Sequence, residues 1–226
     1  MVDHLQQLLK TVVEEYLATA APVGSQRLVE RYGLDMSSAT VRNRFAELEQ
    51  AGLVTQPHTS GGRIPTEKGF RRYVELFVKD KPAGKKETAA LRQACELAAE
   101  NGWQTKNLAK ALSALAGQAV FVTTGQADTF YTGLSQLFAQ PEFRDWQRVV
   151  SLSEVFDSLN ETLQSLQEQD FPQPRVLLGR DCPFGAVCGA VVISFDDGLL
   201  GLLGPVRMDY QRAISLMSTV LQILNS

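Results

Sequence analysis

Histidine and cysteine are scarce in this sequence, which argues against the catalytic and metal sites that depend on them. The 226 residues include two histidines, His4 and His58, and three cysteines, Cys95, Cys182 and Cys188. Two histidines, one near a terminus and one in a glycine-rich stretch, make a Ser-His-Asp or Cys-His group difficult to assemble. The cysteines lack zinc-site spacing, so we expect reduced cytosolic thiols. Phosphate-binding loop and metal-ligand motifs are also missing, so the sequence predicts neither an enzyme nor a metal or other cofactor.

Long apolar runs are missing as well. No apolar stretch approaches the roughly 20 residues of a membrane span. The first ten residues are polar and amphipathic and do not have the layout of a signal peptide. We therefore expect a cytoplasmic protein without a membrane partner, and its length suits one large or two modest domains.

Net charge is low and unevenly distributed. The whole chain carries −3, but residues 1–86 hold 13 Lys and Arg against 10 Asp and Glu, which gives +3. The remaining residues hold 9 against 15, which gives −6. A basic head on an acidic body would direct the head toward nucleic acid while the body stays away from it.

The most informative stretch runs from Ser37 to Thr66 and begins with a helix. Ser37 stands where an N-cap belongs, and Val41, Phe45 and Leu48 recur at helical spacing. Gly52 then supplies the left-handed residue that ends such a helix. The opposite face is small, polar or basic, as a helix that enters a major groove requires.

A short hairpin follows this helix directly. Residues 53–56 form the predicted first strand, residues 57–63 a glycine-rich polar tip, and Ile64 begins the return. A hairpin behind a recognition helix is the wing of a winged helix-turn-helix, whose tip approaches phosphate or the minor groove. The predicted DNA-binding residues are Ser25, Gln26, Ser38, Ala39, Thr40, Arg42, Asn43, Arg44, His58, Thr59, Ser60 and Arg63.

Three further helices complete the predicted N-terminal domain. The first spans about residues 3–18, the second begins with Ser25 as its cap, and Thr66 caps a fourth that runs through Val78. We place the winged-helix domain at residues 1–80, a charged linker that contains Pro and Gly at residues 81–86, and a second domain at residues 87–226.

The second domain reads as α+β. The predicted elements are helices at 87–100, 105–116, 129–139, 154–169 and 209–224, and strands at 119–123, 176–178, 187–195 and 199–203. Arg207, Asp209 and Tyr210 stand at a strand-to-helix junction and fit either a small-molecule pocket or an ordinary junction. In the ordinary junction, which we favour, Asp209 caps the last helix, Arg207 pairs locally and Tyr210 packs.

Five segments resemble the HrcA family of heat-inducible transcription repressors. They are residues 22–25, 37–43, 56–60, 62–66 and 204–210. The resemblance implies a dimeric repressor of heat-shock (chaperone) operons that binds an inverted repeat in double-stranded DNA, with activity supported by the GroE chaperonin. It also implies that the second domain is GAF-like and mediates homodimer formation. Family members are typically longer, and this chain resembles a shortened form that lacks the central inserted segment.

Two other functions stay open at this point. A GAF-like second domain would also suit a metabolite-responsive winged-helix regulator with a ligand-sensing domain. Alternatively, the winged helix could dock protein instead of DNA. Salt-dependent binding to duplex DNA would argue against the protein-docking role. A rise in melting temperature with a small metabolite would support the ligand-sensing regulator.

Overall fold

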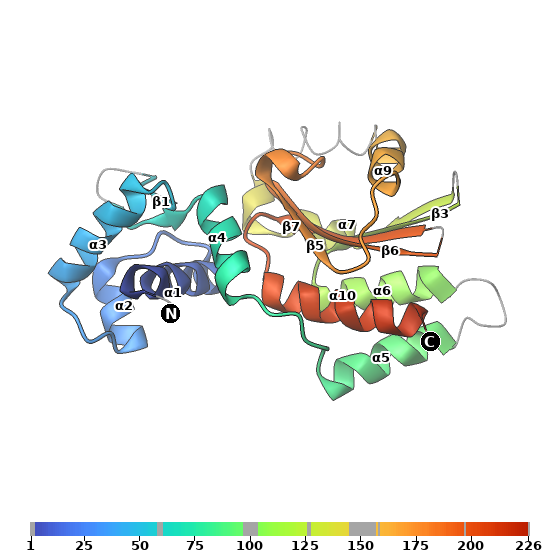
Figure 1. Ribbon diagram of the computed structural model, residues 1–226, viewed down its shortest axis with the longest axis horizontal. Helices are drawn as coiled ribbons and strands as arrows, with labels where there is room; N and C mark the ends of the chain where they lie inside the picture. The colour runs from blue at the N-terminus through green and yellow to red at the C-terminus, as the bar shows by residue number, and fades with distance from the viewer. Residues whose placement is uncertain are drawn as a thin grey trace. The chain divides into compact units, whose positions relative to one another are not determined.

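The computed structural model describes residues 3–57, 61–96, 104–125, 128–144, 157, 159–196 and 198–225. The chain divides into two compact units, Met1–Val78 and Lys79–Ser226, both drawn in Figure 1. Of the helices in the described ranges, none combines the length and the apolar character that crossing a bilayer requires.

The first unit consists of four helices and a short hairpin. Its elements are α1 His4–Thr19, α2 Ser25–Tyr32, α3 Ser38–Gln50, β1 Val54–Thr55, β2 Ile64–Pro65 and α4 Glu67–Phe77. The apolar stripes predicted from the sequence meet in one core, in which Leu9, Val12, Leu28, Val41 and Leu48 are fully buried.

Side-chain caps fix where three of these helices begin. Asp3 forms a capping box with Gln6, Ser37 Oγ accepts from the amide of Thr40 at 3.1 Å, and Thr66 accepts from Gly69. The predicted Ser37 and Thr66 caps are confirmed. The predicted Ser25 cap was wrong, because Gly24 is the N-cap and Ser25 is already the first helical residue.

The hairpin is tied to the segment before α2. Val54 pairs with Pro65 and Thr55 with Ile64 in antiparallel register. Val23 forms an additional antiparallel bridge with Arg63, with N···O distances of 2.8 and 2.9 Å. A Cβ at Gly62 would lie 2.4 Å from the carbonyl oxygen of Val23, so this approach requires glycine.

The second unit is built on a five-stranded antiparallel sheet of order β4-β3-β7-β6-β5. Its strands are β3 Ala119–Thr124, β4 Asp128–Thr132, β5 Arg175–Leu178, β6 Cys188–Phe195 and β7 Gly198–Pro205. Val122 pairs with Leu200, and Val191 pairs with Leu202. Every residue of β7 is buried, so this central strand is covered on both faces.

Helices cover both faces of the sheet (Figure 1). They are α5 Lys85–Glu96, α6 Gln104–Ala116, α7 Leu134–Phe138, α9 Leu159–Gln167 and α10 Tyr210–Leu224, with 3-10 segments η1 Pro141–Arg144 and η2 Gly179–Asp181. On one face α6 contacts β3 and α10 contacts β6, while α5 packs against both helices. On the other face α7, η1 and α9 supply Leu137, Phe143 and Leu163 to a buried apolar cluster.

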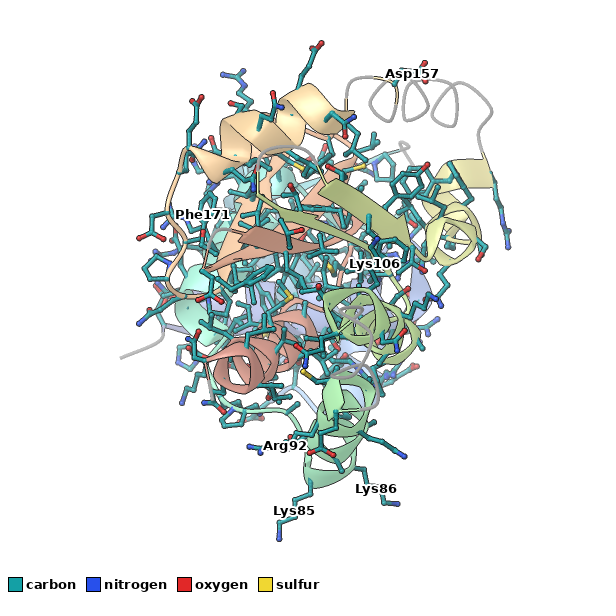
Figure 2. The ribbon with its side chains drawn as sticks, turned by 90° about the vertical axis from the view of Figure 1, so that its right-hand side faces the viewer. Lys85, Lys86, Arg92, Lys106, Asp157 and Phe171 are labelled. Carbon is teal, nitrogen blue, oxygen red and sulfur yellow. The ribbon has the colours of Figure 1, made fainter. Side chains whose placement is uncertain are left out.

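Helix α5 presents a basic outer side. Figure 2 shows Lys85, Lys86 and Arg92 projecting outward from this helix, and all three are exposed. The predicted linker, residues 81–86, therefore includes the first two residues of α5, and the second unit begins at Lys79.

The α+β prediction is confirmed for the second unit, but one of its predicted helices was wrong. Residues 129–139, predicted as a single helix, form strand β4 followed by the short helix α7. The β-branched and aromatic residues of Asp128–Thr132 pair with β3, and a tertiary partner decides the structure of so short a segment. Of the predicted helix 154–169, residues 154–156 and 158 lie outside the described part of the chain.

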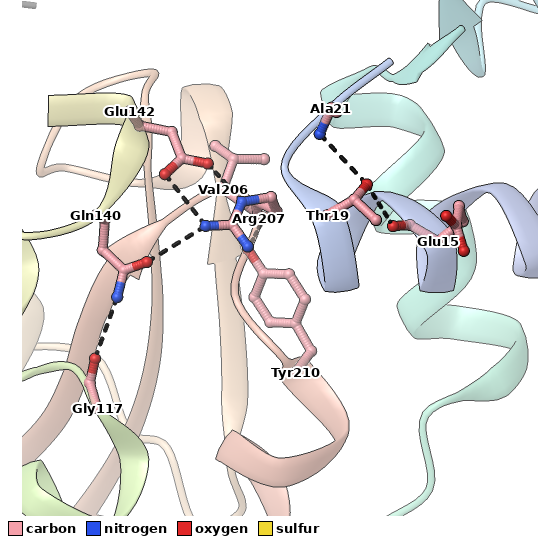
Figure 3. Close-up of polar contacts among 9 residues, drawn as sticks. All are labelled: Glu15, Thr19, Ala21, Gly117, Gln140, Glu142, Val206, Arg207 and Tyr210. Atoms are coloured by element: carbon pink, nitrogen blue, oxygen red, sulfur yellow. Dashed lines mark hydrogen bonds and ion pairs between the residues drawn. The ribbon is translucent and has the colours of Figure 1, made fainter. Parts of the chain in front are cut away.

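The junction between β7 and α10 follows the ordinary interpretation with one correction. Asp209 caps α10 through the amide of Arg212 at 3.0 Å, and the buried Tyr210 hydroxyl donates to the carbonyl of Val206 at 2.8 Å. Arg207, however, pairs with Glu142 at 2.6 Å and with Gln140 at 3.3 Å (Figure 3). The pairing is therefore not local, because Glu142 lies 65 residues away in the sequence.

Candidate nucleic-acid interface

The first half of α3 presents an exposed polar face. Ala39, Thr40, Arg42 and Asn43 are exposed, whereas Ser38 is half-buried. The opposite face, which carries Val41, Phe45 and Leu48, is buried in the core of the first unit. Burial of one face fixes the direction of the other, so the predicted base-reading side chains point outward together.

Helix α2 begins beside this face. The guanidinium Nε of Arg42 donates to the hydroxyl of Ser25 at 3.4 Å, which connects the predicted base-reading and phosphate-contacting residues. Gln26 is exposed, and its amide donates to Glu30 at 2.9 Å. The N-cap, Gly24, provides no side-chain hydrogen bond, so the first amides of α2 stay available to an anion.

A buried carboxylate holds α2 against α1. The side chain of Glu15 is 1% exposed and forms ion pairs with Arg27 Nε and with Arg31 Nη1, the latter at 2.9 Å. The carbonyl of Glu15 accepts from the hydroxyl of Thr19 at 2.8 Å, as Figure 3 shows. Sequence reasoning missed Glu15, although a carboxylate three residues after Val12 on an apolar helix face signals a buried ion pair.

Charged residues near the interface differ in whether they are paired. Arg44 forms an ion pair with Glu47 at 2.8 Å, and on α4 Arg71 pairs with Glu67 and Arg72 with Glu75. Within the described ranges no acidic side chain forms an ion pair with Arg42. The guanidinium of Arg42 is therefore left to a phosphate or a base edge at the exposed face.

The hairpin contributes Arg63, but its side chain is not free. Its Nη2 lies 3.0 Å from Oε2 of Glu49 in α3, and the side chain is 17% exposed. Among the described residues its Nε is buried without a hydrogen-bond partner. Glu49 was not among the predicted site residues, and nothing local in the sequence links it to Arg63. His58, Thr59 and Ser60, predicted at the hairpin tip, lie outside the described residues.

The structure thus brings together the residues of α2 and α3 that were expected to act as one surface. Ser25 and Arg42 are in contact, and Asn43 is the neighbour of Arg42 on the exposed face. Arg63 instead reaches α3 through Glu49. The arrangement offers helix amides without a side-chain cap, a guanidinium that has no acidic partner among the described residues, and an exposed amide side chain, a set that suits phosphate and base edges.

Comparison with protein families gives one match that covers most of the chain. The model described as the HrcA protein C-terminal domain matches residues 71–214. That range begins inside α4 and ends inside α10, so it includes the sheet of the second unit.

Curated relatives match a shorter stretch. A heat-inducible transcription repressor HrcA from Nocardia farcinica is 49% identical over 94 residues, which is 42% of this chain and 27% of that protein. Another from Xanthomonas euvesicatoria pv. vesicatoria is 46% identical over 100 residues, or 44% of this chain and 28% of the relative. The matched stretch thus spans little more than a quarter of these relatives' own length.

Among solved structures, the crystal structure of a hypothetical protein resembles this chain with a TM-score of 0.73. The similarity covers 99% of this chain and 96% of that one at 17% sequence identity. At this identity the similarity concerns the fold alone.

Proposed function

The chain belongs to the HrcA family, and from this premise we propose that it is a heat-inducible transcription repressor that binds duplex DNA. In this proposal the first unit is a winged helix-turn-helix, α3 is its recognition helix and the hairpin β1–β2 is its wing. Heat-shock (chaperone) operons are the proposed targets, as the family resemblance implies.

One observation carries the proposal. The exposed Ala39, Thr40, Arg42 and Asn43 share the N-terminal half of one helix, and Arg42 touches Ser25 at the start of another. This is the layout in which the second helix of a helix-turn-helix enters the major groove while the first meets the backbone. Helix α2 also begins without a side-chain cap, next to the exposed face of α3. The first amides of such a helix can bind a phosphate, which an ordinary surface helix would not require.

Within the proposal the site residues divide by role. Asn43 and Arg42, with Ser38, Ala39 and Thr40 beside them, face the base edges, because an amide reads adenine and a guanidinium reads guanine. Ser25 and Gln26 contact phosphate and position the first unit on the duplex, and Arg44 contacts DNA at the edge of the same surface. In the wing, His58, Thr59, Ser60 and Arg63 meet the backbone or the minor groove, and Arg63 must first leave Glu49.

Assembly is part of the proposal. A single winged helix buries only about 600–1,000 Å² on DNA, which rarely supports tight specific binding. We therefore include a homodimer whose GAF-like second domain joins two heads on an inverted repeat. Support by the GroE chaperonin enters through the family resemblance alone.

Salt-dependent binding to duplex tests the proposal most directly. Fluorescence anisotropy with a labelled random-sequence duplex should show affinity that falls linearly with the logarithm of salt concentration. A variant with Arg42→Gln should show a shallower slope. Binding that ignores salt, or no binding at low salt, would contradict DNA recognition and favour a protein-docking role.

A ligand-sensing second domain is the competing proposal. Both faces of the central strand β7 are covered by protein, which gives a metabolite little room at the middle of the described sheet. A thermal-shift screen against small metabolites decides the matter, since a ligand that binds only the native state raises the melting temperature.

A further inference from the structure

Helix α10 carries a polar stripe on a largely apolar surface. Gln211, Ser215, Ser218 and Thr219 follow one another at helical spacing, and the last three are buried. Buried hydroxyls on a core helix need partners, because an unsatisfied polar group in the interior is costly. In the part of the chain that the structure describes, the partners of the stripe outside its own helix lie in one segment, Lys79–Ala83, which we call the strap.

The strap is hydrogen-bonded along the stripe. The amide of Lys79 donates to Gln211 Oε1 at 3.0 Å, and Gln211 Nε2 donates back to the carbonyl of Lys79 at 2.9 Å. Ser218 Oγ donates to the carboxylate of Asp80. The amide of Ala83 donates to Thr219 Oγ1 at 2.8 Å. The stripe thus holds the strap at Lys79 and Asp80 and at Ala83.

Little apolar burial supports these bonds. Residues 79–82 are exposed, and Ala83 is only partly buried. A cavity of about 240 Å³ lies between the strap, the Gln173–Pro174 segment and the outer side of α10 near Leu221. A segment held by a few hydrogen bonds, with incomplete packing beneath it, belongs to the least stable parts of a fold.

Release of the strap should therefore depend on temperature. Its hydrogen bonds each contribute modestly, since the released groups bond to water instead. Against them stands the conformational entropy that the freed residues regain. Heating therefore shifts the equilibrium of the strap from the bonded to the released state. This shift should occur at a lower temperature than the unfolding of the central sheet, which is buried on both faces.

Connectivity makes the strap important for the first unit. Helix α4 ends at Phe77 and the first unit ends at Val78, so Lys79 is the first residue of the second unit. While the strap is bonded, the covalent tether between the units is very short. Once it is released, the tether extends to Gly84, just before α5 begins at Lys85.

We propose that the strap is a heat-releasable clamp: bound to the stripe of α10 it keeps the tether short, and its release lowers the affinity for a two-half-site operator. The inference rests on the proposed function. When one DNA-binding unit of the dimer is bound, a longer and more flexible tether lowers the effective concentration of the second unit at the other half-site. Loss of the bonded strap therefore weakens binding to two half-sites and leaves the single-site affinity unchanged.

The experiment uses the full chain with substitutions in the stripe. Thr219→Val keeps the shape of the side chain but removes the acceptor for Ala83, and Gln211→Leu removes both bonds to Lys79. Gln222→Leu is the matched control: Gln222 is exposed, lies three residues after Thr219 on α10 and lines the cavity beside the strap, and among the described residues it forms no hydrogen bond to the strap. Thr219→Ser keeps the hydroxyl that accepts from Ala83 and should behave like the wild-type chain.

The readouts are hydrogen exchange of the Lys79 and Ala83 amides, and the temperature at which DNA is half released. The DNA is a duplex selected by the wild-type chain from a random pool, compared with one of its half-sites. We expect exchange to rise about tenfold in Thr219→Val and Gln211→Leu, with unchanged exchange in β6 and β7. The release temperature should fall for the full duplex and stay constant for the half-site, with the control and Thr219→Ser like wild type.

Two results would overturn the clamp. Unchanged exchange at Lys79 and Ala83 in the variants would show that the stripe does not hold the strap. Faster exchange with an unaltered release temperature would show that strap release does not govern DNA binding. Failure of the wild-type chain to select any duplex would instead refute the proposed function, and the exchange data would still report on the strap.

Discussion

The guanidinium of Arg63, the residue just before the return strand β2, is paired with the carboxylate of Glu49 near the end of α3, with 3.0 Å between Nη2 and Oε2. The pair joins the proposed wing to the proposed recognition helix. It also places a negative charge beside the surface that should meet phosphate. If the first unit binds DNA as proposed, DNA and Glu49 would compete for Arg63.

Removal of Glu49 should strengthen DNA binding. In Glu49→Gln, Arg63 is free to contact phosphate and one repulsive charge is lost. We expect the affinity for random duplex to rise about tenfold at low salt, and the slope of log affinity against log salt to steepen by about one unit per head. Anisotropy titrations over a series of salt concentrations measure both quantities.

The Arg63→Ala background provides the control for this experiment. There the slope change caused by Glu49→Gln should disappear, because the side chain that it frees is absent. Arg63→Ala alone should weaken binding to every sequence alike and flatten the slope. An unchanged slope in Arg63→Ala would mean that Arg63 only holds the hairpin against α3.

Asn43 should read sequence, whereas Ser25 should not. Asn43→Ala should cost about 1–3 kcal/mol on a selected duplex and much less on random duplex, because base-edge hydrogen bonds are sequence-specific. Ser25→Ala should weaken both duplexes by similar factors. Competition titrations with the two duplexes give the ratio, and equal losses for Asn43→Ala would exclude base reading by this residue.

Glu15 should stabilise the first unit. Its buried carboxylate pairs with two half-exposed arginines, so Glu15→Gln should destabilise the unit by about 1–3 kcal/mol. Native-state hydrogen exchange of α1 and α2 in the full chain reports the loss. The exposed pair between Lys10 and Glu14 on the same helix is the comparison, and Glu14→Gln should change exchange very little.

The two buried thiols predict how the second unit responds to alkali. Burial raises the pKa of Cys182 from 9.0 to about 11 and the pKa of Cys188 to about 12. The folded state therefore favours the neutral thiols, a contribution that is complete below pH 9 and is lost as pH rises toward 11 and 12. The free energy of unfolding, measured by denaturant at each pH, should stay flat with respect to these thiols up to about pH 9 and then decline.

The double variant Cys182→Ala, Cys188→Ala tests whether these two thiols cause the loss of stability at alkaline pH. It should be less stable at neutral pH, because it loses buried side chains, yet its stability should fall less steeply above pH 9. An alkaline decline of the same steepness in the double variant would assign the effect to other groups, such as Tyr210, whose pKa burial also raises.

The full chain should be a homodimer that prefers two half-sites. Sedimentation should give twice the 24.9 kDa of one chain, and a full inverted repeat should bind far more tightly than one half-site. A monomer that binds both DNAs equally would contradict the proposed assembly.

Sequence by itself determined the features that depend on near neighbours. Ser37 caps α3 through the amide of Thr40 and Thr66 caps α4 through Gly69, each bond closing over three residues. The left-handed φ of +71° at Gly52 follows from the same local chemistry. Apolar stripes likewise fixed which face of α3 is buried, and hence which candidate side chains point outward.

Tertiary structure alone decided the contacts between distant residues. Arg207 meets Glu142 across 65 positions, and the strap meets α10 across 132, so no periodicity could pair them. Residues 128–132 form a strand because β3 offers an unpaired edge, not because the segment itself excludes a helix. Arg63 turns to Glu49 for the same reason: sheet register and helix packing, which arise only when the chain is folded, set which charges become neighbours.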